Sequence, residues 1–175
     1  PFSIPGALVE SLKNNQPLKE DEAALFRRTF SRATLRFGDG DLPYLGKGFS
    51  VPQSQGDDLH RSTRDGRIAM DLHRAEDYVV TLEAAGDEGQ TLVLELNGRG
   101  ALNCPLTPQL RRCEGIAGSP LFRAGRNEIR VRVEPVNPMT RDARLYSIDL
   151  TPRRNAVEPK PDATRSSRAS LQPAA

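Results

Sequence analysis

Residues 121–135, with the sequence LFRAGRNEIRVRVEP, are the stretch that decides the fold. Ile129, Val131 and Val133 alternate with charged residues after a Gly-Arg-Asn turn. Successive side chains of a strand point to opposite faces, so this pattern predicts a β-strand with one buried face and one solvent-facing side. Arg130 and Arg132 occupy the solvent-facing side, where they are the first candidates for a binding surface.

The same alternation recurs on both sides of this stretch. Further strands are expected, from the spacing of apolar residues, at 33–38, 46–51, 66–73, 77–84, 90–98, 99–106 and 144–150. Asn97-Gly98 is a strong signal for a type I′ hairpin. Short strands about every 10 to 14 residues, with no helices between them, predict an all-β fold, an antiparallel jelly-roll-like β-sandwich. Residues 53–65 are polar and predict a loop.

The sandwich is expected to span residues 33–152 and to have an extension at each end. Residues 1–32 predict a short helical N-terminal arm, in which Leu25, Phe26 and Phe30 form an apolar stripe that would contact the domain or a partner. Residues 153–175 are rich in Pro, Ser and Ala and predict an extended or disordered, flexible basic C-terminal tail.

Charge and hydropathy exclude two classes of protein. The net charge is +2, and the tail holds five Arg or Lys residues against two acidic ones, so the positive charge belongs to the tail. A basic fold is not indicated, and we expect no nucleic-acid partner. No run approaches the roughly 18 apolar residues of a transmembrane segment.

Two cysteines, Cys104 and Cys113, enclose the segment CPLTPQLRRC. The spacing does not match a C-x-x-C redox or zinc motif. It favours a disulfide that closes a short loop, which would place the protein in a periplasmic or extracellular compartment. The alternative is a pair of free thiols in a cytosolic protein.

Two longer segments resemble a known family. LVLELNGRGALNCPL, residues 92–106, followed by residues 121–135 is similar to the hairpin and strand of galactose-binding-like jelly rolls. These β-sandwich modules are attached to many glycoside hydrolases and envelope glycosyltransferases. The resemblance covers residues 45–151 and implies a non-catalytic accessory or interaction module of cell-envelope or extracellular glycan machinery. Such a module would bind a saccharide weakly or scaffold a partner protein.

The candidate ligand site combines charged and aromatic residues. Arg130 and Arg132 could bind a carboxylate-bearing glycan or an acidic partner, with Glu95 beside them. Phe49 stands where sugar-binding members of the family often have a Trp. The alternative is that the arginines form ordinary cross-strand ion pairs with Glu95, Asp71 or Asp149.

Two groups of residues suggest metal sites. Asp39 and Asp41 flank a glycine and could contribute to a structural calcium site of the kind that such jelly rolls often carry; an ordinary Asp/Gly turn is the alternative. DLHR occurs twice, at 58–61 and 71–74. Asp58, His60, Asp71 and His73 would be the ligands if the protein were a metal-dependent hydrolase.

Other catalytic signals are absent from the sequence. It contains no G-x-S-x-G nucleophile motif and no glycine-rich phosphate loop, so we expect no enzyme and no cofactor beyond a possible structural calcium. A further hypothesis is a structural subunit of a larger assembly, which contacts protein partners through its arm and tail.

Overall fold

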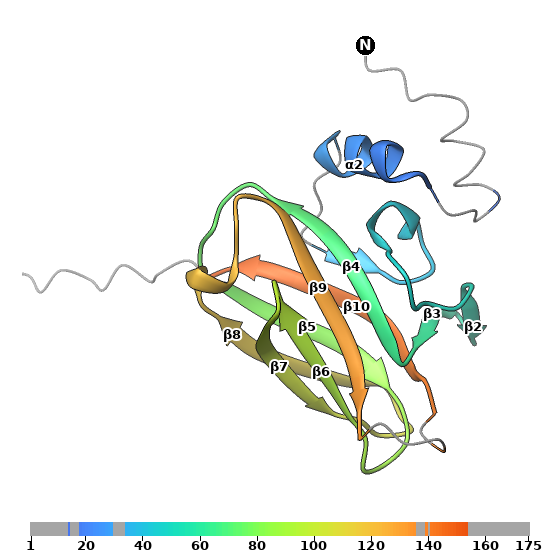
Figure 1. Cartoon of the computed structure of the whole chain (residues 1–175). Helices are drawn as coiled ribbons and strands as arrows, with labels where there is room; N and C mark the ends of the chain where they lie inside the picture. The colour runs from blue at the N-terminus through green and yellow to red at the C-terminus, as the bar shows by residue number, and fades with distance from the viewer. Residues whose placement is uncertain (1–13, 15–17, 30–33, 136–138, 140, 154–175) are drawn as a thin grey trace, which may run out of the picture.

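Two antiparallel β-sheets packed face to face form the domain in the computed structural model (Figure 1). The structure describes residues 14, 18–29, 34–135, 139 and 141–153. Most of these residues lie in strands, as the alternation of apolar residues predicts. The all-β antiparallel sandwich expected from the sequence is therefore confirmed.

The larger sheet has six strands within the part of the chain that the structure describes. Its order is β2-β3-β10-β5-β8, and β1 pairs with β10 off this path. The strands are β1 (Thr34–Arg36), β2 (Gln53–Gln55), β3 (Asp58–Thr63), β5 (Tyr78–Ala85), β8 (Arg111–Ala117) and β10 (Ala143–Pro152). The last strand thus lies near the centre of this sheet, between segments that are far apart in the sequence.

The smaller sheet has four strands in the order β4-β9-β6-β7. They are β4 (Asp65–Leu72), β6 (Thr91–Leu96), β7 (Arg99–Pro105) and β9 (Gly125–Glu134). The turn between β6 and β7 is Asn97-Gly98, with φ of 50° and 81°. Positive φ at both central residues is the type I′ geometry that matches strand twist, so the predicted hairpin is confirmed.

The core lies between the two sheets and is made by the inward-facing residues of both. Val131 is fully buried at the centre of β9, with Leu94 opposite it on β6. Leu82 and Ile148 face them from the larger sheet and are also fully buried. Each such side chain contributes about 1.5–3 kcal/mol of hydrophobic stabilisation. The strand facing predicted for residues 121–135 is therefore confirmed.

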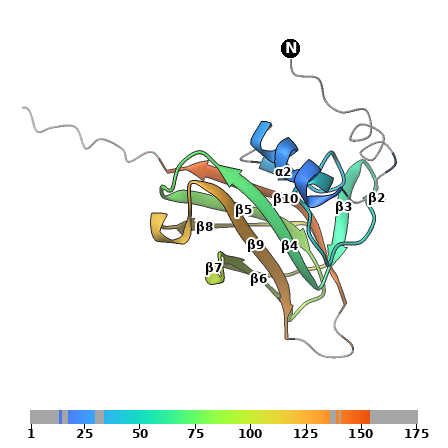
Figure 2. The ribbon, with the colours of Figure 1, turned by 45° about the horizontal axis from the view of Figure 1, so that its top comes forward.

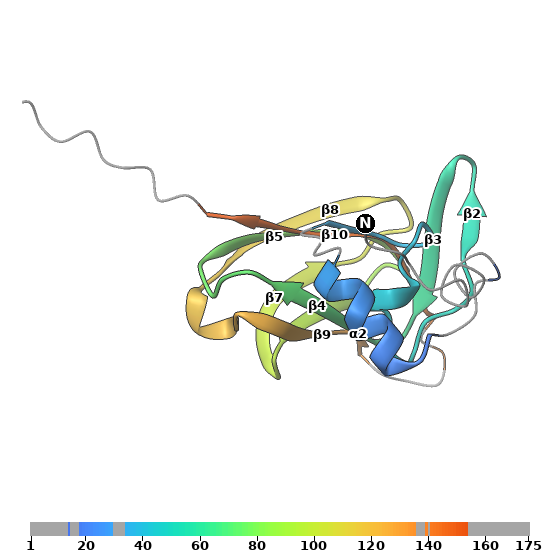
Figure 3. The same cartoon turned by 90° about the horizontal axis from the view of Figure 1, so that it is seen from above.

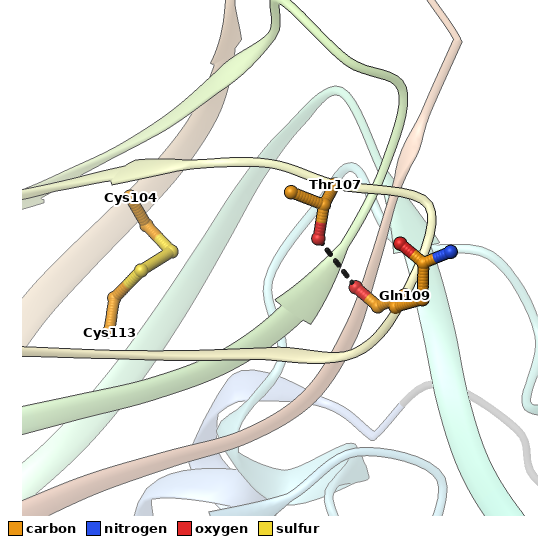
Figure 4. The surroundings of a disulfide bond; sticks show 4 residues. All are labelled: Cys104, Thr107, Gln109 and Cys113. Carbon is orange, nitrogen blue, oxygen red and sulfur yellow. Dashed lines mark hydrogen bonds between the residues drawn. A yellow bond between two sulfur atoms is a disulfide. The ribbon is translucent and has the colours of Figure 1, made fainter.

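A disulfide joins Cys104 of β7 to Cys113 of β8, as predicted, with their Cα atoms 5.7 Å apart (Figure 4). These strands lie at the edges of different sheets, so the bond ties the two layers together. The loop between the cysteines is short, and Thr107 Oγ1 donates a hydrogen bond of 3.0 Å to the carbonyl oxygen of Gln109 within it. The disulfide therefore also holds the two ends of this loop close together.

Helix α2 (Glu20–Thr29) packs against β4 and the short 3-10 helix η1 (Leu42–Tyr44) (Figure 2). Its contact face includes Ala23 and Arg27, both buried. Arg27 donates hydrogen bonds to the carbonyl oxygen of Pro43 at 2.6 Å and to Glu20 at 2.7 Å, and lies 3.4 Å from Asp71 of β4. A buried arginine thus fastens the predicted helix to the sandwich. The rest of the helical arm predicted for residues 1–32 lies mostly outside the described residues.

Several local expectations were wrong. Residues 53–65 form the β2–β3 hairpin and the start of β4, not a loop. Residues 46–51 do not form a regular strand: Phe49 makes an isolated bridge to Thr63, and Leu45, just before the segment, makes another to Ile68. Strand β8 was not expected, and a second 3-10 helix, η2 (Ser119–Leu121), precedes β9. No helix in the described part of the chain is long and apolar enough to cross a membrane.

Candidate functional site

The arginine row on β9 faces solvent and is engaged in ion pairs. Arg130 makes two hydrogen bonds to the carboxylate of Asp65, at 2.8 and 2.6 Å. Arg132 lies 3.1 Å from Glu95 and also pairs with Glu134. Strands β4 and β6 place these carboxylates beside β9. Glu95 is therefore a neighbour of the row, as the sequence suggests.

The electrostatics of this face follow from the pairing. Hydrogen bonds from Arg130 outweigh partial burial and hold the pKa of the Asp65 carboxyl below its ordinary value. The same contacts raise the pKa of Arg130. Because the arginines are already neutralised by neighbouring carboxylates, an anionic ligand would have to compete with those carboxylates. This face has the character of a cross-strand ion-pair network.

Phe49 lies apart from the arginine row. Its ring stacks on Phe37 with centroids 5.6 Å apart, and it packs against the hydrophobic core. A β-carbon at Gly66 would come within 2.5 Å of the Phe49 ring, which shows how closely the ring covers the backbone there. The ring thus contributes to core packing, and the structure does not bring it to the candidate ligand residues of β9 and β6.

Asp39 and Asp41 have different surroundings. Asp41 is buried, and its carboxylate accepts hydrogen bonds from Arg61 at 2.5 and 2.8 Å and from the backbone N–H of Gly38 at 2.7 Å. Asp39 is exposed. A calcium ion bound to Asp41 would therefore have to displace Arg61. Across the described residues, no group of three or more His, Cys, Asp or Glu side chains could hold a metal ion.

The two DLHR segments lie on different sheets. Asp58 and His60 belong to β3, whereas Asp71 belongs to β4 and pairs with Arg27, and His73 is exposed just beyond β4. Their four side chains do not form a group able to hold a metal ion. His60 is buried, and its ring contacts the Tyr146 ring in a tilted arrangement with centroids 5.2 Å apart. Burial, reinforced by the charge of Arg144, lowers the pKa of His60.

A cleft of about 270 Å³ lies on the outer face of the larger sheet. The β2–β3 hairpin stands at one end of the molecule and extends beyond the layer formed by β5, β8 and β10 (Figure 3). We call this hollow the hairpin cleft. Its lining residues are Thr34, Arg36, Phe37, Asp39, Asp57, Asp58, Leu59, Glu83, Leu110, Tyr146 and Ser147.

Contacts to β10 hold the hairpin in position. The side-chain oxygen of Gln55 on β2 accepts hydrogen bonds from Tyr146 at 3.1 Å and from Arg144 at 2.6 Å. Arg144 also donates to the carbonyl oxygen of Pro108, at 2.7 Å, in the disulfide-closed loop. These hydrogen bonds therefore link the β2–β3 hairpin, strand β10 and the disulfide-closed loop to one another around the cleft. The shape of the cleft thus depends on all three segments.

The cleft combines apolar and polar groups. Leu59 from β3 and Leu110 from the disulfide-closed loop are 44% and 50% exposed, and both line the cleft, which gives it accessible apolar surface. Among the polar residues, Ser147 Oγ donates a hydrogen bond of 2.7 Å to Glu83. Convergent polar groups beside apolar surface are typical of small-molecule sites.

A second hollow adjoins Arg132 on the outer face of the smaller sheet. It is shallow and open, and its lining residues are Gly89, Thr91, Val93, Asn103, Arg132, Glu134 and Pro135. None of these residues has an aromatic ring, and Arg132 is paired with Glu95 and Glu134. The hairpin cleft is therefore the stronger candidate site.

The predicted partner-contact residues are only partly described. Leu25 is more than half exposed on α2, whereas the side chain of Phe26 and the whole of Phe30 lie outside the described residues. Helix α2 itself contacts the sandwich through a different face, which contains Ala23 and Arg27. A role of the apolar stripe in partner binding stays a prediction.

Comparison with known proteins identifies the fold. No protein-family model matches the sequence, and no curated protein is similar to it in sequence. Among solved structures, a GH26–CBM35 β-(1,4)-mannanase from Podospora anserina matches with 18% identity and a TM-score of 0.51, over 70% of this chain and 28% of that chain. The chain thus spans less than a third of that enzyme.

A family 35 carbohydrate-binding module from Clostridium thermocellum matches with 15% identity and a TM-score of 0.51, over 67% of this chain and 97% of that chain. This chain therefore has the galactose-binding-like jelly-roll fold found in carbohydrate-binding modules, as the resemblance in sequence implies. At such identities the likeness establishes the fold, while the site must be argued from its residues.

Sequence reasoning missed most of the hairpin cleft, although it singled out Asp39 and Asp58 as candidate metal ligands. The missed signal was Gly56-Asp57 between the polar segments QSQ and DLH, because a Gly-X pair between two short segments is typical of a two-residue hairpin. Recognising the hairpin would have shown that this polar stretch forms a wall and not a surface loop.

Proposed function

We propose that this chain is a non-catalytic accessory module that binds a saccharide in the hairpin cleft and works in extracellular or cell-envelope glycan machinery. Support comes first from the jelly-roll fold, which the chain shares with a carbohydrate-binding module. Many unrelated functions use one fold, so the proposal also needs a site with suitable chemistry. The hairpin cleft supplies that site.

The observation that carries the proposal is the combination of groups in the hairpin cleft. A saccharide presents hydroxyl groups at its edges and C–H surface on its ring faces. Exposed Leu59 and Leu110, with the Tyr146 ring, offer apolar surface, while Ser147 and Glu83 offer hydrogen-bonding groups. The chemistry of the cleft therefore fits both surfaces of a sugar ring.

The cleft is also held in place before any ligand binds. Tyr146 is fixed by its hydrogen bond to Gln55 and by the tilted contact of its ring with the His60 ring. Fixing a side chain in advance reduces the conformational entropy that binding costs. The sequence has no Trp, so the cleft lacks the largest ring available for stacking, and we expect weak affinity for a single sugar residue.

The proposed compartment rests on the disulfide. The Cys104–Cys113 bond includes every cysteine of the sequence. Disulfides persist in oxidising compartments and are rare in the cytosol. The extracellular space and the periplasm are oxidising, and an accessory module of glycan machinery would also encounter its saccharide ligand in these compartments.

A glycan array followed by calorimetric titration of the best ligand tests the proposal. We expect retention of at least one oligosaccharide, and loss of its binding in Leu59→Ser with Leu110→Ser. These side chains are exposed, so the fold should survive the change, with a stability effect within about 0.5 kcal/mol each. Ile116→Ser, also exposed on the larger sheet but outside the cleft, is the matched control and should bind normally.

Two results would contradict the proposal. Retention of no oligosaccharide at all would remove the saccharide function. Loss of binding in Arg130→Ala with Arg132→Ala, together with normal binding in the leucine variant, would move the site to the outer face of the smaller sheet.

A further inference from the structure

The acidic and basic groups that line the hairpin cleft are unequal in number, and three of the carboxylates make no ion pair within the described part of the chain. Four of its lining residues carry a carboxylate and one carries a guanidinium. Outside the cleft, Asp41 pairs with Arg61 and Asp65 pairs with Arg130. Within the described part of the chain, no ion pair involves Asp39, Asp57 or Asp58. These three aspartates therefore bring negative charge to the cleft that no ion pair among the described residues neutralises, whereas Glu83 lies opposite Arg112 of β8.

Arg36 does not cancel this charge. It lies opposite Ser147 on β10, and Ser147 lies opposite Glu83 on β5. Two inter-strand spacings thus separate the backbones of Arg36 and Glu83, about 10 Å. Glu83 accepts its hydrogen bond from the neutral hydroxyl of Ser147. The net charge of the lining stays negative in the pH range where carboxylates are ionised.

The carboxylates are spread out and do not form a compact cluster. No group of three or more acidic, His or Cys side chains among the described residues is arranged to hold a metal ion. Asp57 and Asp58 come from the β2–β3 hairpin, Asp39 from the turn after β1, and Glu83 from the sheet. Separated charges along a cleft fit an extended ligand with several separated positive charges better than one compact ion.

We propose that the hairpin cleft selects oligosaccharides that carry protonated amino groups, such as chains of deacetylated amino sugars, and discriminates against uronic acids and sulfated sugars. This inference rests on the proposed saccharide-binding function. Clefts lined by charge of one sign focus the field and raise the local concentration of oppositely charged ligand. Leu59, Leu110 and Tyr146 contact the sugar rings, and the carboxylates select the charge.

The choice of a saccharide over a basic peptide follows from the rest of the lining. The cleft has a volume of about 270 Å³, and its lining combines the aromatic residues Phe37 and Tyr146 with two leucines. Lysine side chains would satisfy the carboxylates but would leave this apolar surface largely uncovered. A saccharide with amino groups would contact both the carboxylates and the apolar surface, because its charged amino groups are attached directly to the sugar ring.

The test is calorimetric titration with four tetrasaccharides and one peptide, at about pH 6, where the carboxylates are ionised. The probes are β-1,4-linked glucosamine, its N-acetylated form, cellotetraose, a galacturonic acid tetramer and tetralysine. We expect the glucosamine tetramer to bind about tenfold more tightly than the neutral tetramers, and the acidic tetramer not to bind. This preference should diminish as salt is added.

Variants assign the preference to the cleft. Asp57→Asn with Asp58→Asn should weaken glucosamine binding about tenfold more than it weakens cellotetraose binding. Asp21→Asn with Glu114→Gln removes the same amount of charge from exposed positions outside the cleft and should bind as the wild type does. Thermal melting of each variant verifies that it is folded.

Each result separates this inference from the proposed function. If the neutral and glucosamine tetramers bind equally, the charge selection is wrong and saccharide binding stands. If the acidic tetramer binds best, the charge selection is reversed. If tetralysine binds as tightly as the glucosamine tetramer, the cleft recognises basic chains in general and the saccharide class is wrong. If no tetrasaccharide binds, both proposals fail.

Discussion

The ion pair between Arg61 and Asp41 is buried almost completely on both sides. Arg61 belongs to β3, and Asp41 belongs to the turn that precedes η1. The pair therefore fastens the strand that forms one wall of the hairpin cleft to a turn about twenty residues earlier in the chain. A second donor contact from Arg61, to the carbonyl oxygen of Ser50 at 2.8 Å, strengthens this connection.

Asp41→Asn should lower the free energy of unfolding by about 3 kcal/mol, because it removes the buried carboxylate charge to which Arg61 donates two hydrogen bonds. The matched control is Asp65→Asn, which removes the partner of Arg130 from an exposed pair and should cost less than about 1 kcal/mol. Chemical denaturation measures both. Equal and small losses would show that the Arg61–Asp41 pair is not the anchor of β3.

At the residue scale, the sequence identified Asp41 as unusual but suggested a calcium ligand. The Asp-Gly-Asp spacing is compatible with a turn, a metal ligand or an ion-pair partner, and nothing local distinguishes them. The partner, Arg61, is brought near by the pairing of β3 with β10, which is a long-range contact. Side-chain partners of this kind cannot be derived from spacing along the chain.

The β2–β3 hairpin is the element that turns a flat sheet face into a cleft. Its turn is Gly56-Asp57, in which Gly56 has a φ of 63°. A residue with a β-carbon adopts this left-handed region at a cost of about 1–2 kcal/mol, whereas glycine adopts it freely. A β-carbon at Gly56 would contact nothing within 4 Å. Glycine is therefore favoured at this position by the backbone conformation, and not by a lack of room for a side chain.

Gly56→Ala should therefore destabilise the protein by about 1 kcal/mol and weaken saccharide binding, since it strains the turn that carries Asp57 and Asp58. Gly100→Ala is the matched control, because Gly100 also has open space around it but lacks a positive φ. Thermal melting and ligand titration measure the two effects. If both alanine variants behave alike, the hairpin turn does not control the cleft.

At the element scale, the strands that could be predicted from the sequence are those in which apolar and polar residues alternate most regularly. Strands β5, β6 and β9 were predicted because each places a regular row of large apolar residues on one face. Strand β8 has a weaker row, with Cys113 and Ala117 as its buried residues, and was missed. The β2–β3 hairpin is mostly polar, so pairing with β10 and side-chain contacts decide its structure, not local pattern.

At the scale of the whole molecule, the two outer faces of the sandwich differ in charge. The outer face of the smaller sheet carries paired charges, and α2 is fastened beside it by Arg27. Partial burial raises the pKa of Glu20 in α2, but hydrogen bonds and positive charges from Arg27 and Arg126 outweigh burial and lower the pKa overall. The outer face of the larger sheet keeps unpaired charge in a cleft.

The N-terminal arm and the C-terminal tail are the candidate segments for contacts with protein partners. The structural-subunit hypothesis places partner contacts on the arm and tail, and the tail lies outside the described residues. Because Arg27 fastens α2 to the sandwich, removal of residues 1–32 would expose Asp71 and the surface around η1. The arm therefore contributes to the domain itself, whatever partners its other face contacts.

The central claim, that saccharide binds in the hairpin cleft, is tested most directly by amide chemical-shift mapping of the nitrogen-15-labelled protein during titration with the tightest-binding tetrasaccharide. We predict that the largest shifts fall at residues 36–39, 57–59, 110 and 146–147, with saturation at the affinity that calorimetry gives. Largest shifts at residues 65–67 and 128–134, with the cleft unchanged, would contradict the account and place the ligand on the arginine row of β9.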